Sequence, residues 1–104
     1  MAAHFFDIDG TLVNYHTAEW LPGAKEYVLN MFKVGHKIIL FTIRGEQDYG
    51  TNTKKTILKD LDDMGIKYTI LFGVDSPRVI HDDSHIYVDQ RETNQSWSDD
   101  RICM

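Results

Sequence analysis

The stretch Phe5-Phe6-Asp7-Ile8-Asp9-Gly10-Thr11 carries the strongest structural signal in the chain. Apolar residues lead into two carboxylates separated by one residue, and a glycine and a threonine follow. Strand side chains repeat every second residue, so Asp7 and Asp9 are expected to lean to the same side. Gly10 permits the sharp turn that must follow. The stretch therefore predicts a buried strand that ends in two neighbouring carboxylates.

Strand-like and helix-like patterns alternate along the rest of the chain. Strand-like runs occupy His4–Ile8, Lys37–Ile43, Lys67–Phe72 and His85–Asp89. Apolar residues recur at helical spacing within Gly23–Val34 and Asn52–Met64, and a glycine follows each of these runs. This alternation predicts an α/β domain with a mostly parallel sheet. The second and third runs are almost continuously apolar, which is typical of strands covered on both faces.

Length and charge limit the range of functions. The 104 residues fit a single domain, 1–104, and the apolar fraction of 42% argues against disorder. The net charge is −5, and the acidic residues concentrate between residues 75 and 100. Such a chain repels anionic membranes, and nucleic acid is an unfavoured partner. A phosphorylated partner would need a local source of positive charge, and a bound divalent cation is the usual one.

Cysteine content and hydropathy bear on the compartment. Cys103 is the single cysteine, so no disulfide can form within the chain and a reducing compartment is expected. The first residues lack the basic and apolar segments of a signal peptide. No apolar stretch approaches the roughly 20 residues that a membrane span needs. We therefore expect a cytoplasmic protein without a membrane partner.

Polar residues gather where the predicted strands end. In parallel sheets the ligand site lies beyond the carboxyl ends of the strands. The residues at those ends are Asp7, Asp9, Thr42, Arg44 and Asp89. Three carboxylates so close together raise one another's pKa, and a hard cation relieves the repulsion. Asp7, Asp89 and a backbone carbonyl near Asp9 would make an open Mg²⁺ site, whereas the first motif taken alone also fits a plain acidic or calcium-like turn.

Several of these motifs resemble those of one enzyme family. Phe5–Val13 resembles motif I of the haloacid dehalogenase (HAD) superfamily, most of whose members are phosphatases. Ile38–Thr42 resembles motif II and Tyr87–Asp89 resembles motif IV. Asp89–Asn94 is similar to the ending of a group of small capless members. The motifs occur in the family's order and span nearly the whole chain.

The resemblance implies a particular fold. It implies a minimal HAD-like Rossmannoid three-layer sandwich with a mostly parallel four-stranded sheet in the order 4-1-2-3 and no cap domain. The family's small flap would occupy Leu12–Trp20. A site without a cap suits a large substrate or a lid lent by another subunit. Self-association would also protect the exposed edges of a small sheet, so a homo-oligomer is one expectation.

The resemblance also implies catalytic roles. Asp7 would be the nucleophile, and Asp9 would protonate the leaving oxygen and later deprotonate water. Thr42 would donate a hydrogen bond to a phosphoryl oxygen. Mg²⁺ would be held by Asp7, the Asp9 carbonyl and Asp89. The residues expected along the substrate pocket are Gly10, Thr11, Ile43 and Arg44. For Arg44, a salt bridge to Glu46 or Asp48 is the alternative.

Two positions depart from the family pattern. Val74 stands where motif III has a lysine, so another cation must hold the nucleophile and phosphoryl group in register. Arg78 is the nearest replacement, Lys54 and Lys55 are others, and the alternative for Arg78 is a solvated loop charge. Gln90 replaces a second acid after Asp89, and the loss of such a partner often lowers metal affinity 10–100-fold.

The sequence favours one function and leaves others open. The favoured function is Mg²⁺-dependent phosphomonoester hydrolysis through Asp7. A catalytically weak or inactive phosphate-binding or assembly module is the second interpretation, because of the two departures. A polynucleotide 3′-phosphatase, a phosphotransferase or a phosphonatase would use the same residues. Degenerate members usually lose the nucleophile first, and here it is present.

Overall fold

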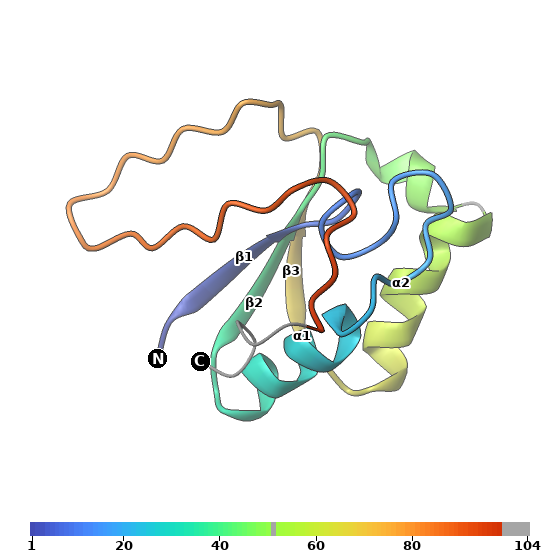
Figure 1. The fold of residues 1–104 in the computed structure, drawn as a ribbon, viewed down its shortest axis with the longest axis horizontal. Coiled ribbons are helices and arrows are strands. Elements are labelled where there is room, and N and C mark those ends of the chain that lie inside the picture. The colour runs from blue at the N-terminus through green and yellow to red at the C-terminus, as the bar shows by residue number, and fades with distance from the viewer. Residues whose placement is uncertain (51, 99–104) are drawn as a thin grey trace.

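A computed structural model describes residues 1–50 and 52–98. For residues 50 and 52–56 it describes the backbone alone. Its elements are β1 (Ala3–Asp7), α1 (Ala24–Lys33), β2 (Lys37–Phe41), the short 3₁₀ helix η1 (Glu46–Gly50), α2 (Asn52–Asp63) and β3 (Tyr68–Leu71) (Figure 1). The predicted alternation of three strands and two helices is confirmed. Gly35 and Gly65 follow the helices with φ of 103° and 74°, as the predicted helix ends require.

The three strands form one parallel sheet in the order β1-β2-β3. Its register pairs Phe5 with Ile39 and Ile39 with Thr69. Because all three strands run in the same direction, their carboxyl ends meet at one edge of the sheet. This arrangement places the polar residues that follow the strands at a common rim.

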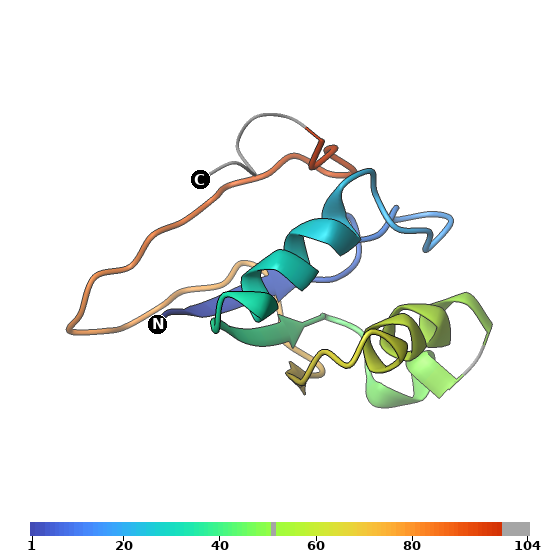
Figure 2. The same cartoon turned by 90° about the horizontal axis from the view of Figure 1, so that it is seen from below.

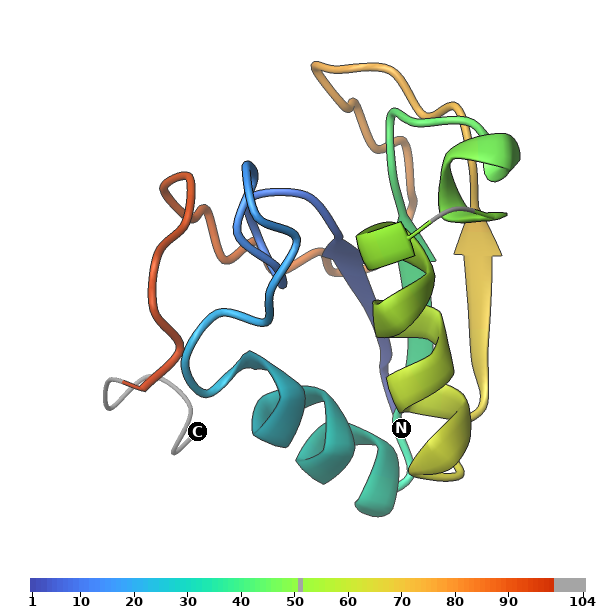
Figure 3. The ribbon, with the colours of Figure 1, turned by 90° about the vertical axis from the view of Figure 1, so that its right-hand side faces the viewer.

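The hydrophobic core lies on one face of the sheet. Phe6, Ile38 and Leu40 alternate with more exposed neighbours and are each at most 5% exposed. They join Val28 of α1 and Leu61 of α2 in a single buried cluster. Figure 3 shows both helices on the near side of the strands. Strands that follow one another in the same direction with right-handed crossovers place their helices on the same face.

The opposite face of the sheet remains partly open. Phe5 is 59% exposed and Leu71 is 46% exposed, although both are large and apolar. Within residues 1–50 and 52–98, no helix covers this face. The described structure therefore has two layers, which differs from the three-layer sandwich predicted above. The apolar runs of β2 and β3 were misleading, because half of their side chains face this open side.

The predicted fourth strand is not formed in this structure. His85–Asp89 pairs with no strand of the sheet, and residues 74–90 make a long open loop that projects beyond β1 (Figures 1 and 2). The side chains of Tyr87 and Val88 are 91% and 76% exposed. A run of β-forming residues has only a local preference for extended backbone, and it becomes a strand of a sheet only when a neighbouring strand pairs with it. The order β1-β2-β3 agrees with the last three places of the predicted order.

The last described residues return to the body of the protein. Trp97 is 3% exposed, and its ring packs against Tyr27 with a centroid distance of 4.7 Å. Its indole Nε1 donates to the Thr11 carbonyl at 2.7 Å, and its backbone N donates to the Pro22 carbonyl at 2.7 Å. Trp97 thus supports the loop that follows β1. No helix in the described part of the chain is long and apolar enough to cross a bilayer.

Candidate functional site at the carboxyl ends of the strands

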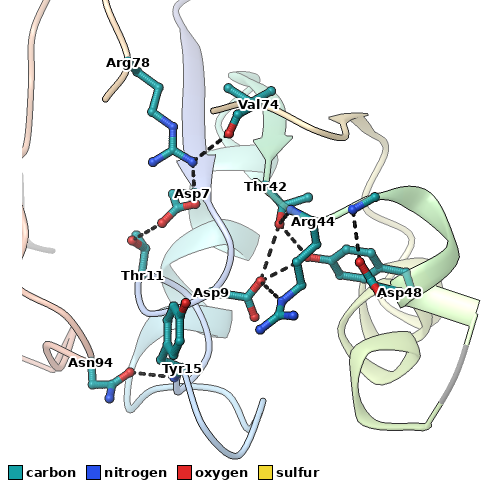
Figure 4. A network of polar contacts seen from close by, with 12 residues as sticks. Asp7, Asp9, Thr11, Tyr15, Thr42, Arg44, Asp48, Val74, Arg78 and Asn94 are labelled. Carbon is teal, nitrogen blue, oxygen red and sulfur yellow. Dashed lines mark hydrogen bonds and ion pairs between the residues drawn. The ribbon is translucent and has the colours of Figure 1, made fainter. Parts of the chain in front are cut away.

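Backbone hydrogen bonds hold the rim together beyond β2 and β3. Thr42 follows β2, and its N–H donates to the Leu71 carbonyl at 3.1 Å. Val74 follows β3, and its N–H donates to the Thr42 carbonyl at 2.8 Å. Asp7 ends β1 on the neighbouring strand (Figure 4). Three segments far apart in sequence are therefore fixed side by side, as the parallel topology predicts.

Asp7 is a partly buried carboxylate with two partners. Its Oδ2 accepts a hydrogen bond from Thr11 Oγ1 at 3.0 Å, and its Oδ1 lies 3.7 Å from Arg78 Nη2. Burial raises the pKa of Asp7, and the nearby Asp9 acts in the same direction. The Thr11 hydrogen bond and the Arg78 charge oppose that rise in pKa. The carboxylate is thus poorly hydrated but remains available at the rim.

Asp9 is more deeply buried, and one of its oxygens gathers three groups. The side chain is 5% exposed. Its Oδ2 lies 3.0 Å from Arg44 Nε and 3.4 Å from both Thr42 Oγ1 and the Tyr49 hydroxyl (Figure 4). Asp7 and Asp9 come from the same strand end, as predicted, yet each binds a different arginine. The two carboxylates therefore occupy distinct environments.

The predicted turn after the carboxylates is present. Gly10 has φ of 84°, and its N–H donates to the Val13 carbonyl at 2.8 Å. A Cβ at this position would lie 3.2 Å from the Thr93 methyl carbon. The Gly10 carbonyl accepts from the Asn94 N–H at 2.7 Å, and Asn94 Oδ1 accepts from the Tyr15 N–H at 2.7 Å. Asn94 thus fastens the loop over 12–20 to the C-terminal segment.

Arg78 reaches Asp7 from the loop that follows β3. Its Nη2 donates to the Val74 carbonyl at 3.1 Å and lies 3.7 Å from Asp7 Oδ1. Its guanidinium carbon stands 5.0 Å from the centre of the Phe41 ring. The structure therefore brings Arg78 to the candidate nucleophile. The side chains of the other candidates, Lys54 and Lys55, lie outside the described residues.

Arg44 lies at the rim as predicted and binds Asp9. The alternative partners were Glu46 and Asp48, but Asp48 Oδ2 instead accepts from the Gly45 N–H at 3.1 Å. Ile43, predicted to line the pocket, has a side chain that is 52% exposed. Arg44 is therefore positioned to meet an anion at the rim, while the Ile43 side chain faces outward.

Asp89 does not join the two aspartates at the rim. Its Oδ2 accepts from Arg91 Nη1 at 2.8 Å, and its side chain is 49% exposed. No group of three or more His, Cys, Asp or Glu side chains in the described ranges is arranged to hold a metal ion. Asp7 and the adjoining backbone supply oxygen donors of the kind that Mg²⁺ prefers, but the third predicted ligand lies elsewhere. Gln90 beside it is exposed.

Tyr49 is a member of the site that the sequence did not reveal. It is 5% exposed, and its hydroxyl donates to Thr42 Oγ1 at 3.0 Å. Burial raises the pKa of Tyr49 to about 12, so the phenol keeps its proton at neutral pH. Its ring packs against Phe72 with a centroid distance of 5.5 Å. The sequence offers one indication of its role, an isolated aromatic residue within the segment 45–52, whose other residues are typical of a polar loop.

Comparison of the chain with protein-family models, curated proteins and solved structures finds no match.

Proposed function

We propose that this chain is a Mg²⁺-dependent phosphomonoester hydrolase that acts through an aspartyl-phosphate on Asp7. The observation that carries the proposal is the pairing of carboxylates and guanidiniums at one rim. Asp7 faces Arg78 at 3.7 Å and Asp9 faces Arg44 at 3.0 Å. A phosphate ester at this rim would find a nucleophile, an acid and two cations. The composition further supports a cytoplasmic location.

The two carboxylates divide the chemistry between them. In the first half-reaction an Asp7 oxygen attacks phosphorus, the bond from phosphorus to the ester oxygen breaks, and Asp9 gives that oxygen a proton. In the second half-reaction Asp9 takes a proton from water, and the water oxygen attacks phosphorus. The bond from phosphorus to Asp7 then breaks and inorganic phosphate leaves. The position of Asp9 supports this role, because its carboxylate lies at the same rim as Asp7, with Thr42 Oγ1 3.4 Å from its Oδ2.

The cations at the rim have separate tasks in this proposal. Arg78 takes the place of the motif III lysine and keeps the phosphoryl group in register with Asp7. Arg44 moves from Asp9 to a phosphate oxygen, because its guanidinium forks onto such groups. Thr42 donates a hydrogen bond to the same phosphoryl group. Mg²⁺, bound by Asp7, the Asp9 carbonyl and Asp89, would offset the repulsion between the carboxylate and the phosphate.

Binding of Asp89 at the rim would require residues 85–89 to change position. We propose that they add to the free edge of β1 as a fourth strand, which gives the order 4-1-2-3 and the HAD-like fold that the motifs suggest. The exposed Ile86, Tyr87 and Val88 support this, since pairing would remove apolar surface from water. Within residues 1–50 and 52–98, no strand pairs with the outer edge of β1, and this supports it as well.

A phosphate-binding module with little or no turnover is the second candidate. The observation that favours it is that each rim carboxylate already has an arginine partner while Asp89 lies elsewhere. Such a module would bind inorganic phosphate through Arg44 and Arg78 without transferring a phosphoryl group.

Phosphate release from p-nitrophenyl phosphate and a panel of phosphate esters tests the proposal. The wild type should release phosphate only with Mg²⁺, and Asp7→Asn should abolish turnover rather than raise KM. Asp63→Asn is the control, because Asp63 lies on α2 with a side chain 62% exposed, and it should retain full activity. If the wild type and Asp7→Asn are equally silent on every ester, the hydrolase is excluded. Binding of inorganic phosphate by that silent wild type would then identify the module.

A further inference from the structure

The hydroxyl groups of Tyr49 and Thr42 form a chain that ends at Asp9. The Tyr49 hydroxyl lies 3.0 Å from Thr42 Oγ1, and Thr42 Oγ1 lies 3.4 Å from Asp9 Oδ2. Tyr49 is 5% exposed and Thr42 is 1% exposed, so water has little access to either group. Each hydroxyl has one proton to donate, so the acceptor chosen by one hydroxyl limits the hydrogen bonds open to the other.

Thr42 Oγ1 has both of its acceptor positions filled. It accepts from the Arg44 N–H at 3.1 Å, and this donor has no choice of direction because it belongs to the backbone. It also accepts from the Tyr49 hydroxyl at 3.0 Å. A hydroxyl oxygen has two acceptor positions and one proton. In this assignment, with both positions taken, the Thr42 proton is donated toward Asp9 Oδ2 and the rim.

The opposite assignment would have Tyr49 donate to Asp9 and Thr42 donate to Tyr49. It would use the same two distances, 3.0 Å between the hydroxyls and 3.4 Å to Asp9 Oδ2. The two assignments differ in the direction of the Thr42 proton, which points toward the rim in the first and inward to Tyr49 in the second. Only the first leaves Thr42 as a donor to a group bound at the rim.

We propose that Tyr49 is a positioning residue that aims the Thr42 hydroxyl proton at a phosphoryl oxygen. The inference rests on the proposed function, because it gives Thr42 its donor role at that site. Tyr49 itself does not touch the substrate in this scheme. Its hydroxyl prevents Thr42 from turning its proton inward, so that the donor is oriented before substrate binds. Preorganised donors of this kind need no reorientation during reaction.

Removal of the Tyr49 hydroxyl in three Thr42 backgrounds tests the role. With p-nitrophenyl phosphate and Mg²⁺, Tyr49→Phe should lower kcat/KM about fivefold to tenfold in the wild type, the effect of one hydrogen bond. It should do the same in Thr42→Ser, which keeps the hydroxyl. In Thr42→Val, itself lowered on the order of a hundredfold, Tyr49→Phe should change kcat/KM by less than about twofold. Tyr68→Phe, at the opposite end of the sheet, is the control and should match the wild type.

The outcomes separate this inference from the proposed function. If Tyr49→Phe lowers kcat/KM equally in the Val and wild-type backgrounds, Tyr49 acts structurally and the positioning role is wrong. The role is also wrong if an active wild type is unaffected by Tyr49→Phe. If the wild type has no turnover, the hydrolase fails, and the affinity for inorganic phosphate decides the inference. The inference would then be supported if Tyr49→Phe weakened phosphate binding in the wild type and in Thr42→Ser but not in Thr42→Val. Equal phosphate affinities with and without Tyr49→Phe in all three backgrounds would overturn it.

Discussion

At the scale of single residues, the rim balances buried charge with paired arginines. Asp7 and Asp9 are adjacent carboxylates with limited access to water, and each has one guanidinium within 3.7 Å. Without those partners, the two like charges would repel each other and destabilise the fold. Thr42 adds a hydroxyl donor to Asp9, and the Tyr49 hydroxyl lies 3.0 Å from Thr42 Oγ1. The arrangement keeps reactive groups together at a cost to stability, which is common at functional sites.

The stability of the protein should reveal the cost of a charged Asp7. The folded-state pKa of Asp7 is raised above 3.8 because of burial, so ionisation is harder in the folded chain. Below the pKa that Asp7 has in the unfolded chain, the carboxyl is protonated in both states, and its burial as a charge costs no stability. As the pH rises from there through the raised pKa of the folded state, the charge on Asp7 lowers the free energy of unfolding. Asp7→Asn should increase the free energy of unfolding at pH 7, measured with urea, and this gain should vanish near pH 3. Asp63→Asn should stay within about 0.5 kcal/mol of the wild type at pH 7. A gain for Asp7→Asn of equal size at both pH values would contradict the pKa argument.

The role of Arg78 makes a second residue-scale prediction. If Arg78 replaces the motif III lysine, Arg78→Ala should lower kcat on the order of a hundredfold, because the charge on the phosphoryl group loses a partner in the transition state. Lys59→Ala on α2 is the control, since Lys59 forms an exposed pair with Asp63 and should leave kcat unchanged. Steady-state kinetics with p-nitrophenyl phosphate provide the measurement. An unchanged kcat for Arg78→Ala would make Arg78 a loop charge.

At the scale of elements, glycines determine how the helices join the rest of the fold. Gly23 precedes α1 with φ of 80°, a conformation that side chains rarely adopt. A Cβ at Gly23 would lie 2.8 Å from the Trp97 carbonyl carbon. Gly65 follows α2 with φ of 74°, but a Cβ there would have nothing within 4 Å. The two positions thus share backbone geometry and differ in crowding.

Alanine at these two glycines should separate backbone strain from steric contact. Gly65→Ala should cost about 1–2 kcal/mol of unfolding free energy, the penalty of the left-handed conformation alone. Gly23→Ala should cost on the order of 3 kcal/mol or more, because the backbone of Trp97 must also move. Urea unfolding followed by circular dichroism gives both values. Equal losses would mean that the C-terminal segment does not pack against Gly23.

At the scale of the whole molecule, one face and one edge of the sheet have no helix or strand over them within residues 1–50 and 52–98. Phe5 and Leu71 lie on the open face, and residues 74–90 extend past β1 without pairing (Figure 1). Exposed edges of this kind are sites of strand addition. The same loop carries Arg78 at one end and Asp89 at the other. Its position therefore decides whether the proposed metal ligands meet.

Proteolysis should report the position of this loop. Chymotrypsin should cut first after Tyr87, which is 91% exposed. If Asp89 joins the rim, Mg²⁺ with inorganic phosphate should slow this cleavage about tenfold, since an ordered strand resists the protease. Asp89→Asn should lose the protection and Asp83→Asn should keep it, as followed by mass spectrometry. Equal cleavage rates with and without Mg²⁺ and phosphate would contradict the fourth strand.

Local patterns accounted for much of the fold. Apolar spacing predicted α1 and α2, and β-forming runs predicted β1, β2 and β3. The topology then placed Asp7, Thr42 and Arg44 at one rim. These predictions held because each depends on neighbours in sequence or on the common direction of parallel strands.

Local patterns were enough to predict the helices, the three strands and the rim at their carboxyl ends, because periodicity and turn residues act over a few positions. The open sheet face, the separation of residues 85–89 from the sheet and the contact of Tyr49 with Thr42 and Asp9 became visible only in the folded chain. Those features depend on which surfaces remain after the core is packed. Packing is a property of the whole chain, and no local pattern contains it.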